Sequence, residues 1–231
     1  MIQRDGRRTR KRNRLRAGRV GELIWGQRSR RIGARCGPRL SIGSMQSMSA
    51  SRSVTIRPRL DKDSDVLFLV AADLDTWEER NPSSPALLTR VAFETQLAQA
   101  DAGTSEKRIS FVIDVDGVAV GGVSLFAFDD LARHAEVGIA VVAEARGNGV
   151  GTAAVSKIVE FAFVRCNLRR LHLEVIASNL GAIRAYEKAG FVIEGQQRDH
   201  AWVRGGYEDI IVMGILRSDW ENRPPEAAPS L

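Results

Sequence analysis

The sequence predicts an α/β (α+β) domain in which helices flank a mixed, mostly antiparallel sheet, preceded by a disordered basic tail. An alternating apolar pattern at 109–115 and 118–128, joined by Asp116-Gly117, is typical of a hairpin. Apolar residues at helical spacing separate two β-like runs at 135–142 and 170–177, which indicates a crossover helix and one parallel pair. Charge separates the first residues from the rest.

The N-terminal segment is strongly basic. Residues 1–43 contain 14 Lys or Arg against Asp5 and Glu22, a net charge of +12, whereas the remaining 20 basic and 26 acidic residues carry −6. The pI of 9.9 therefore describes this segment and does not indicate nucleic-acid binding by the domain. We expect residues 1–50 to be disordered, because so few apolar side chains cannot offset the entropy of ordering.

Other interpretations of this tail stay open. Met45 and Met48 stand just ahead of the first predicted strand, as they would if the start codon were misassigned. An RNA-binding arm or an organelle-targeting segment rich in Arg and Ser would have similar composition. The tail lacks the apolar core of a secretory signal, and no run reaches the roughly 20 apolar residues of a membrane span.

The domain is predicted to occupy 54–217, with a disordered tail at 221–231. It opens with an edge strand, a helix that begins with an acidic residue, a polar loop, a second helix and then the hairpin. The later elements are the two strands around the crossover helix, a helix that ends at Gly190, and a final strand pair around Arg204-Gly205-Gly206. The expected bounds are 54–58, 61–74, 78–85, 87–100, 109–115, 118–128, 135–142, 150–165, 170–177 and 180–189.

A glycine-rich turn connects the strand at 135–142 to the crossover helix. It reads Arg146, Gly147, Asn148, Gly149, Val150, Gly151, Thr152. A turn that opens a helix directs unpaired backbone N–H groups at one point, and absent side chains let an anion approach them. The turn therefore predicts a diphosphate site. A Walker loop would need a Lys before Thr152, and the glycine spacing is not that of a dinucleotide fingerprint.

The turn and the later segment Asn179–Phe191 resemble the acetyl-coenzyme A site of the GNAT superfamily of N-acetyltransferases, over about residues 54–217. Within it, 133–136 and 195–207 resemble spermidine and ribosomal-protein N-terminal acetyltransferases. The resemblance implies acetyl-CoA as co-substrate, with no metal. It also implies that the amides from Arg146 through Thr152 hold the diphosphate, that the thioester carbonyl meets an amide near Val141, and that Asn179 contacts the coenzyme. Asn179 could equally be a plain N-cap.

Acetyl transfer to an amine poses two proton problems. The ammonium must lose a proton, at a cost of about 4 to 5 kcal/mol at pH 7, and the leaving thiolate must be protonated. By the resemblance, Tyr186 is the general acid. Glu136, on the strand before the turn, is the best candidate base, although a solvent-facing strand carboxylate is the plain alternative.

Substrate contacts are expected from Trp77, Glu78 and Glu79 in the polar loop and from Tyr207 in the last hairpin. The two carboxylates would attract a cationic amine. Against a polyamine, Ser124 and Ala127 stand where spermidine enzymes are expected to carry acidic side chains.

The sequence thus predicts an acyltransferase acting on a peptide or protein N-terminus or a small amine. The alternatives are a polyamine or aminoglycoside N-acetyltransferase, and a non-catalytic CoA-binding or RNA-tethered module. Two cysteines, Cys36 and Cys166, do not indicate a disulfide framework, so a reducing, cytoplasmic location is expected. The resemblance makes a homodimer possible and leaves the oligomeric state open; nucleic acid is expected only if the basic tail is real, and no membrane.

Overall fold

The structure, a computed structural model, describes residues 52–76, 88–103 and 107–223. All of them belong to one unit of the chain, Ser49–Leu231. The expected disordered tail at 1–50 lies outside the described residues, as does 224–231 of the expected C-terminal tail.

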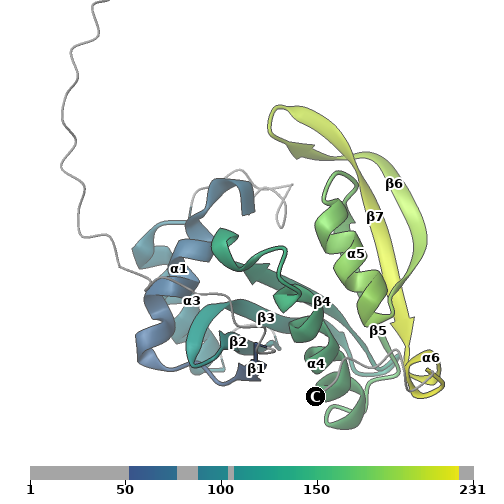
Figure 1. The fold of residues 1–231 in the computed structure, drawn as a ribbon, viewed down its shortest axis with the longest axis horizontal. Coiled ribbons are helices and arrows are strands. Elements are labelled where there is room, and N and C mark those ends of the chain that lie inside the picture. Colours follow the sequence, from purple (N-terminus) through teal and green to yellow (C-terminus); the bar gives the residue numbers. More distant parts are fainter. Residues whose placement is uncertain (1–51, 77–87, 104–106, 224–231) are drawn as a thin grey trace, which may run out of the picture. The chain divides into compact units, whose positions relative to one another are not determined.

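One seven-stranded sheet forms the centre of this unit, in the order β1-β2-β3-β4-β5-β7-β6 (Figure 1). All neighbouring strands pair antiparallel except β4 and β5, which are parallel. The mixed, mostly antiparallel sheet and the parallel crossover are therefore confirmed. The strands are β1 Val54–Arg57, β2 Ile109–Val115, β3 Val118–Asp129, β4 His134–Val141, β5 Arg170–Ile176, β6 Val192–Val203 and β7 Gly206–Leu216.

Helices cover both faces of the sheet. Helix α4 packs against α5 and against the sheet on one face, whereas α1 lies on β3 at the other, where a Cβ on Gly122 would be 3.5 Å from Leu67 Cδ2. The helices of this unit include α1 Ser64–Ala72, α3 Arg90–Asp101, α4 Val150–Val164, α5 Leu180–Ala189 and α6 Arg217–Glu221.

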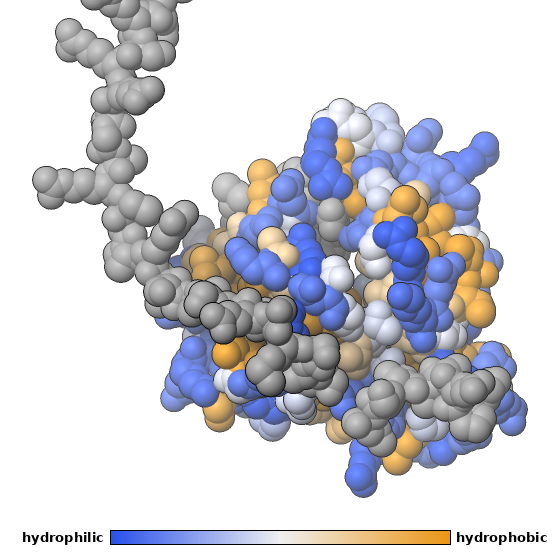
Figure 2. Space-filling view, viewed as in Figure 1, coloured by the Kyte–Doolittle hydropathy of each residue, from blue (hydrophilic) through white to orange (hydrophobic). Residues whose placement is uncertain are grey.

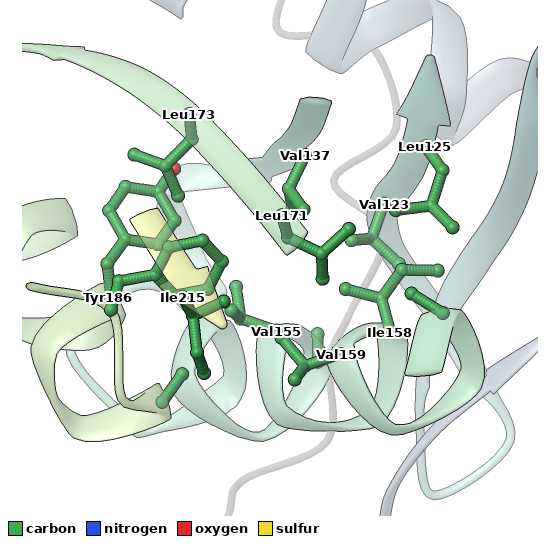
Figure 3. Packing of buried hydrophobic residues seen from close by; sticks show 14 of the residues in the cluster. Val123, Leu125, Val137, Val155, Ile158, Val159, Leu171, Leu173, Tyr186 and Ile215 are labelled. Atoms are coloured by element: carbon green, nitrogen blue, oxygen red, sulfur yellow. The ribbon is translucent and has the colours of Figure 1, made fainter. Parts of the chain in front are cut away.

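The main core lies between α4 and the sheet (Figure 3). Val155, Ile158 and Val159 form the buried face of α4, at the helical spacing visible in the sequence, and they pack in one cluster with Leu171 and Leu173 of β5. Burying each such side chain contributes about 1.5 to 3 kcal/mol. This packing fixes the N-terminal end of α4, which directly follows the glycine turn.

The structure differs from the prediction at the first helix. A 3₁₀ turn, η1 Asp61–Asp63, precedes α1. The Asp63 carboxylate accepts the Leu60 amide at 2.8 Å and also pairs with Arg57, so it closes the turn before the helix and does not cap α1 itself. The competing ion pair explains the interruption.

The C-terminal end also extends beyond the predicted boundary at 217. Helix α6 follows β7 directly, and its Trp220 ring lies 5.6 Å from the Phe163 ring of α4. Arg223 then donates a hydrogen bond to the Ala189 carbonyl at the end of α5. Apolar and polar contacts thus attach this segment to the domain.

The parallel strands diverge after a short contact. Pairing joins β4 and β5 at His134↔Arg170, Ala135↔Leu171 and Glu136↔His172. Farther along, β4 continues along β3 as far as Val141, while β5 continues along β7 as far as Ile176. The separation of the two strands is visible beside α5 (Figure 1).

The surface shown in Figure 2 is mainly hydrophilic, with apolar residues in separate patches. Val192 and Ile193 on the edge strand β6 are among the exposed large apolar residues. Within the residues that the structure describes, no helix has both the length and the apolar character needed to cross a bilayer.

Candidate active site

A cleft of about 600 Å³ opens where β4 and β5 diverge. It passes from one face of the sheet to the other, so that residues on opposite faces share one cavity. On the α4 and α5 side the lining includes Arg146, Gly149, Gly151, Thr152, Asn179, Arg184, Tyr186 and Lys188. On the α1 side it includes Thr76, Arg108, Phe126, Glu136 and Glu174.

The glycine turn forms the start of α4. Gly149 is the N-cap, with φ of 77°, a left-handed conformation that glycine adopts without steric cost. The first helical bond runs from Ala153 N to Gly149 O at 3.0 Å. The amides of Val150, Gly151 and Thr152 therefore precede the helical ladder and lie at the positive end of the helix dipole.

Arg146 organises the turn through its side chain. Its Nε donates to the Val141 carbonyl at 2.9 Å and its Nη2 to Thr76 Oγ1 at 2.8 Å. Its own amide donates to the Ala143 carbonyl at 3.2 Å. The predicted row of diphosphate-binding amides therefore begins at Gly147, since that of Arg146 already has an acceptor.

Two other predicted residues of the turn act on the protein itself. Asn148 donates its side-chain amide to the Arg146 carbonyl at 3.1 Å, and the Val150 side chain is buried in the core. Neither side chain is among those that line the cleft. Each of these two residues can therefore offer an anion only its backbone amide.

Asn179 begins α5. Its Oδ1 accepts the Ala182 amide at 3.1 Å, so the N-cap role weighed in the sequence is present, and the residue also lines the cleft. Arg184 and Lys188, one turn apart on the same helix, line the cleft as well. This side of the cavity is therefore basic.

Tyr186 lies on α5, on the same side of the cleft as the glycine turn. Its side chain is buried among the core residues, as Figure 3 shows, and its ring centroid is 6.0 Å from that of Phe191. It nevertheless lines the cavity. The ring is thus fixed by packing, which suits a hydroxyl that must be placed accurately.

Glu136 is half-buried on β4 and lines the α1 side of the cleft. Burial raises the pKa of its carboxyl, the nearby Glu174 carboxylate raises it further, and the Arg108 guanidinium opposes both effects. A raised pKa makes a carboxylate a better proton acceptor near neutral pH.

The sequence did not single out Arg108 or Glu174. Arg108 lies just before β2; its Nη1 donates to Ser124 Oγ at 3.0 Å, and its Cζ lies 4.5 Å from the centre of the Phe126 ring. Phe126 is the cross-strand partner of Glu136. Side chains alternate along β5, so the sequence was enough to place Glu174 and His172 on the same face of that strand. Nothing in the local sequence indicated that this face lies beside Glu136.

The predicted substrate contacts are only partly placed. Trp77, Glu78 and Glu79 lie outside the described residues. Tyr207 is 70% exposed at the start of β7, with its ring 4.9 Å from that of Trp202, and is not among the described residues that line the cleft. The neighbouring Arg204 Nη1 is 4.0 Å from Asp75 Oδ1, which brings this hairpin tip toward the helical segment that carries Thr76.

The basic side of the cleft fits an acyl-coenzyme A. Free amides at a helix start suit a diphosphate, and the cavity continues between the strands to Tyr186 and Glu136. In the described part of the chain, no cluster of three or more His, Cys, Asp or Glu side chains could hold a metal ion.

A mixed sheet whose parallel pair opens beside a glycine turn and a buried tyrosine is the arrangement of coenzyme A-dependent acyltransferases. A family model described as acetyltransferase (GNAT) family matches residues 72–191. The chain belongs to the GNAT acetyltransferase family.

Curated relatives share about a third of the aligned residues. Spermidine N(1)-acetyltransferase of Escherichia coli (strain K12) is 33% identical over 123 residues, which are 52% of this chain and 65% of that protein. YdaF of Bacillus subtilis, provisionally named as a ribosomal N-acetyltransferase, is 33% identical over 106 residues, 46% of this chain and 58% of YdaF. The chain thus spans less than two thirds of the length of these relatives.

The fold has a solved counterpart. The crystal structure of spermidine N-acetyltransferase from Vibrio cholerae, in complex with CoA and spermine, has a TM-score of 0.66 at 23% identity. The match covers 73% of this chain and 98% of the other. At this identity the likeness concerns the fold.

Proposed function

We propose that the protein transfers an acetyl group from acetyl-CoA to a primary amine. The observation that carries the proposal is the single cleft between β4 and β5. It joins a helix start with free amides, the buried Tyr186, and the carboxylates of Glu136 and Glu174. A nucleotide-bearing donor and a cationic acceptor could therefore enter from opposite faces of the sheet and meet beside Tyr186.

In this proposal the residues divide the work of a direct attack. Glu136 takes a proton from the acceptor ammonium, and the neutral amine nitrogen then bonds to the thioester carbonyl carbon. As the carbon–sulfur bond breaks, Tyr186 donates its hydroxyl proton to the sulfur, and the second proton of the attacking nitrogen is lost and replaces the one given up by the tyrosine, which leaves a neutral amide. Amides from Gly147 through Thr152, with Arg184 and Lys188, bind the phosphates, and an amide near Val141 is the proposed donor to the thioester carbonyl.

The acceptor class is proposed from charge and from the relatives. Glu136 and Glu174 favour a cationic amine, while Arg108 on the same side disfavours a polycation. We therefore place a peptide or protein N-terminus, or a small amine with one charge, ahead of polyamines and aminoglycosides. Because one relative is named for spermidine and another for a ribosomal acceptor, polyamines and protein N-termini are both considered as acceptors. Trp77, Glu78, Glu79 and Tyr207 remain proposed acceptor contacts.

An acceptor panel tests the proposal. Thiol release from acetyl-CoA is measured with spermidine, with peptides that begin with Ala, Ser or Thr, and with an aminoglycoside. Release with a peptide and little with spermidine is expected. A protein that binds the coenzyme but releases thiol with none of these amines would contradict the transferase proposal and favour a non-catalytic CoA-binding module.

Tyr186→Phe separates the hydroxyl from the ring. The ring packing is kept, so coenzyme affinity and thermal stability should change little, while turnover should fall by about 10²-fold or more if the hydroxyl protonates the sulfur. Unchanged turnover would remove Tyr186 from the chemistry.

Other parts of the proposal concern partners and location. A reducing, cytoplasmic location is proposed from the low cysteine count alone; among the described residues, Cys166 is a free cysteine. Burial raises the pKa of this thiol, which argues against a nucleophilic role. A homodimer and an RNA contact by the basic tail rest on the family and on composition.

A further inference from the structure

A row of titratable side chains leads away from the cleft at Glu136. Its Oε2 is 4.0 Å from His172 Nε2. The His172 ring centroid is 5.2 Å from that of His134, with the planes at 80°. His134 Nε2 is in turn 3.8 Å from Asp129 Oδ2. We call Glu136, His172, His134 and Asp129 the acid–imidazole row.

The sheet register fixes this row. Glu136 is paired with His172 across the parallel β4–β5 contact, and His134 with Asp129 across β3–β4. His134 and Glu136 are two residues apart on β4, so their side chains share one face. Backbone pairing therefore brings the four residues of the row together.

Exposure increases toward the far end of the row. The side chains of Glu136 and His172 are 29% and 25% exposed, whereas those of His134 and Asp129 are 32% and 46% exposed. Asp129 is the last residue of β3, beside the turn to β4. The row thus begins in the cleft and ends at solvent, at a place separate from the cleft itself.

Building on the proposed acetyl transfer, we propose that the acid–imidazole row carries the acceptor's proton from Glu136 to solvent. The ammonium proton passes to the Glu136 carboxylate and then to His172. His172 releases its other proton to His134, and His134 releases one beside Asp129 to bulk water. Each imidazole ends in the charge state in which it began and in its other tautomer, which proton exchange with water restores, so no further reactant is needed.

The reaction requires that Glu136 lose the proton it has accepted. When coenzyme and acceptor fill the cleft, water that could take the proton from Glu136 is displaced, and the base must be reset before each turnover. The separations of 4.0 Å and 3.8 Å close to hydrogen-bond distance with side-chain shifts of about 1 Å, as expected before substrates bind.

His134 carries a second sign of this role. Its Nδ1 is buried and has no hydrogen-bond partner among the described residues. A buried ring nitrogen without a partner is costly in a merely structural histidine. Here it gives the imidazole a vacant position on one side while its Nε2 lies near Asp129, the two-ended arrangement that a relay requires.

The electrostatics bring donor and acceptor closer in proton affinity. Burial raises the pKa of Glu136, and burial lowers that of His172, assisted by His134 and Arg170. Glu174 raises the pKa of both groups. Arg108 lowers the pKa of Glu136, and Glu194 raises that of His172. Because the two pKa values shift toward each other, proton transfer between the groups is more nearly balanced.

The chain offers a matched control, because it has three histidines and the third, His200, is exposed on β6 outside the cleft lining. The experiment measures steady-state thiol release at saturating acetyl-CoA and acceptor, because every turnover after the first requires Glu136 to be reset. We expect His172→Gln and His134→Gln each to slow release by about 10- to 100-fold at pH 7 and His200→Gln to leave it unchanged. Added imidazole should restore the rate of the slowed variants.

Normal release in both relay variants would overturn the proposal, as would a loss that imidazole does not restore. A second readout needs no turnover: the histidine ring protons are followed by NMR against pH. His134→Gln should shift the titration of His172 but not that of His200. If no amine releases thiol, the transferase proposal fails, whereas independent titration of His134 and His172 refutes the row.

Discussion

Two glycines of the turn before α4 differ in backbone conformation. Gly149 has φ of 77°, where a side chain is strained, whereas Gly151 lies in the first turn of α4 with φ outside the left-handed region and open space at its Cβ position. Both line the cleft. A side chain added at Gly151 therefore changes ligand access without straining the backbone, whereas one added at Gly149 strains the backbone as well.

Gly151→Ala should stabilise the protein by about 0.5 to 1 kcal/mol, because Ala favours a helix, yet weaken coenzyme binding, because its methyl enters the anion approach. Gly149→Ala should lower both stability and affinity. Urea denaturation and calorimetric titration with CoA measure the two quantities. Unchanged affinity in a folded Gly151→Ala protein would argue against the phosphate site at this turn.

The pH dependence of kcat/KM tests Glu136. A base works when ionised, so the rate should fall as pH decreases through its raised pKa. Glu174→Gln removes a like charge, lowers that pKa and moves the acid limb to lower pH. Arg108→Gln removes an opposite charge and moves the limb to higher pH. Shifts in the same direction would contradict the assignment.

Local sequence was sufficient to predict some of the residues that line the cleft and not others. Gly149, Gly151, Asn179 and Tyr186 could be placed because each stands in a motif whose geometry is local, a turn or a helix start. Arg108 could not be placed, since it reaches Glu136 only through the pairing of three strands. Tyr207 was expected near the substrate from chain position, but its ring packs on Trp202 at an exposed hairpin tip.

At the scale of elements, an ion cluster joins β1 to η1 and β2. Arg57 donates to Asp63 through Nη1 at 2.6 Å and Nη2 at 3.0 Å, and to Asp114 through Nε at 2.8 Å. The hydrogen bond from Arg57 lowers the pKa of Asp63 to about 2, despite the burial of that carboxyl. The cluster holds the edge strand to the first helix.

Asp63→Asn should destabilise the protein by about 3 kcal/mol near neutral pH, because it leaves Arg57 without its main counter-charge. The contribution of Asp63 is present above its unfolded pKa near 3.9 and is lost as pH falls toward about 2. Urea denaturation at several pH values measures it. Asp65→Asn is the control, since its pair with Arg90 is exposed to solvent and its loss should change stability little.

Most strands and helices follow from periodicity, because each buries one face against the rest of the domain. The exceptions depend on distant partners. The break between η1 and α1 comes from Arg57, and α6 is too short to show a pattern; it is ordered by Trp220 against Phe163. Polar segment 78–85, expected as a loop, lies outside the described residues.

At the scale of the molecule, charge separates the basic tail from the domain. Removing residues 1–44 changes the net charge from +6 to −6. A protein that starts at Met45 should therefore lose affinity for single-stranded RNA by at least about tenfold at low salt, while its melting temperature stays the same. Filter binding at several salt concentrations measures this. Equal RNA affinity would assign binding to the domain and contradict the charge argument.

Fold class and family could be predicted from the sequence because element order and one motif suffice for both. Acceptor class could not, since it depends on which side chains from separate strands and loops converge.

The brief contact between β4 and β5 has a mechanical consequence. Three residue pairs join a four-stranded part of the sheet to a three-stranded part, and α4 bridges them from one face. Beyond that contact, within the described residues, the facing edges of β4 and β5 have no strand partner, and Val137 to Val141 of β4 and Val175 of β5 line the cleft. Unpaired strand edges are free to pair with an extended chain, so a ligand lying between them could add backbone pairing to the sheet.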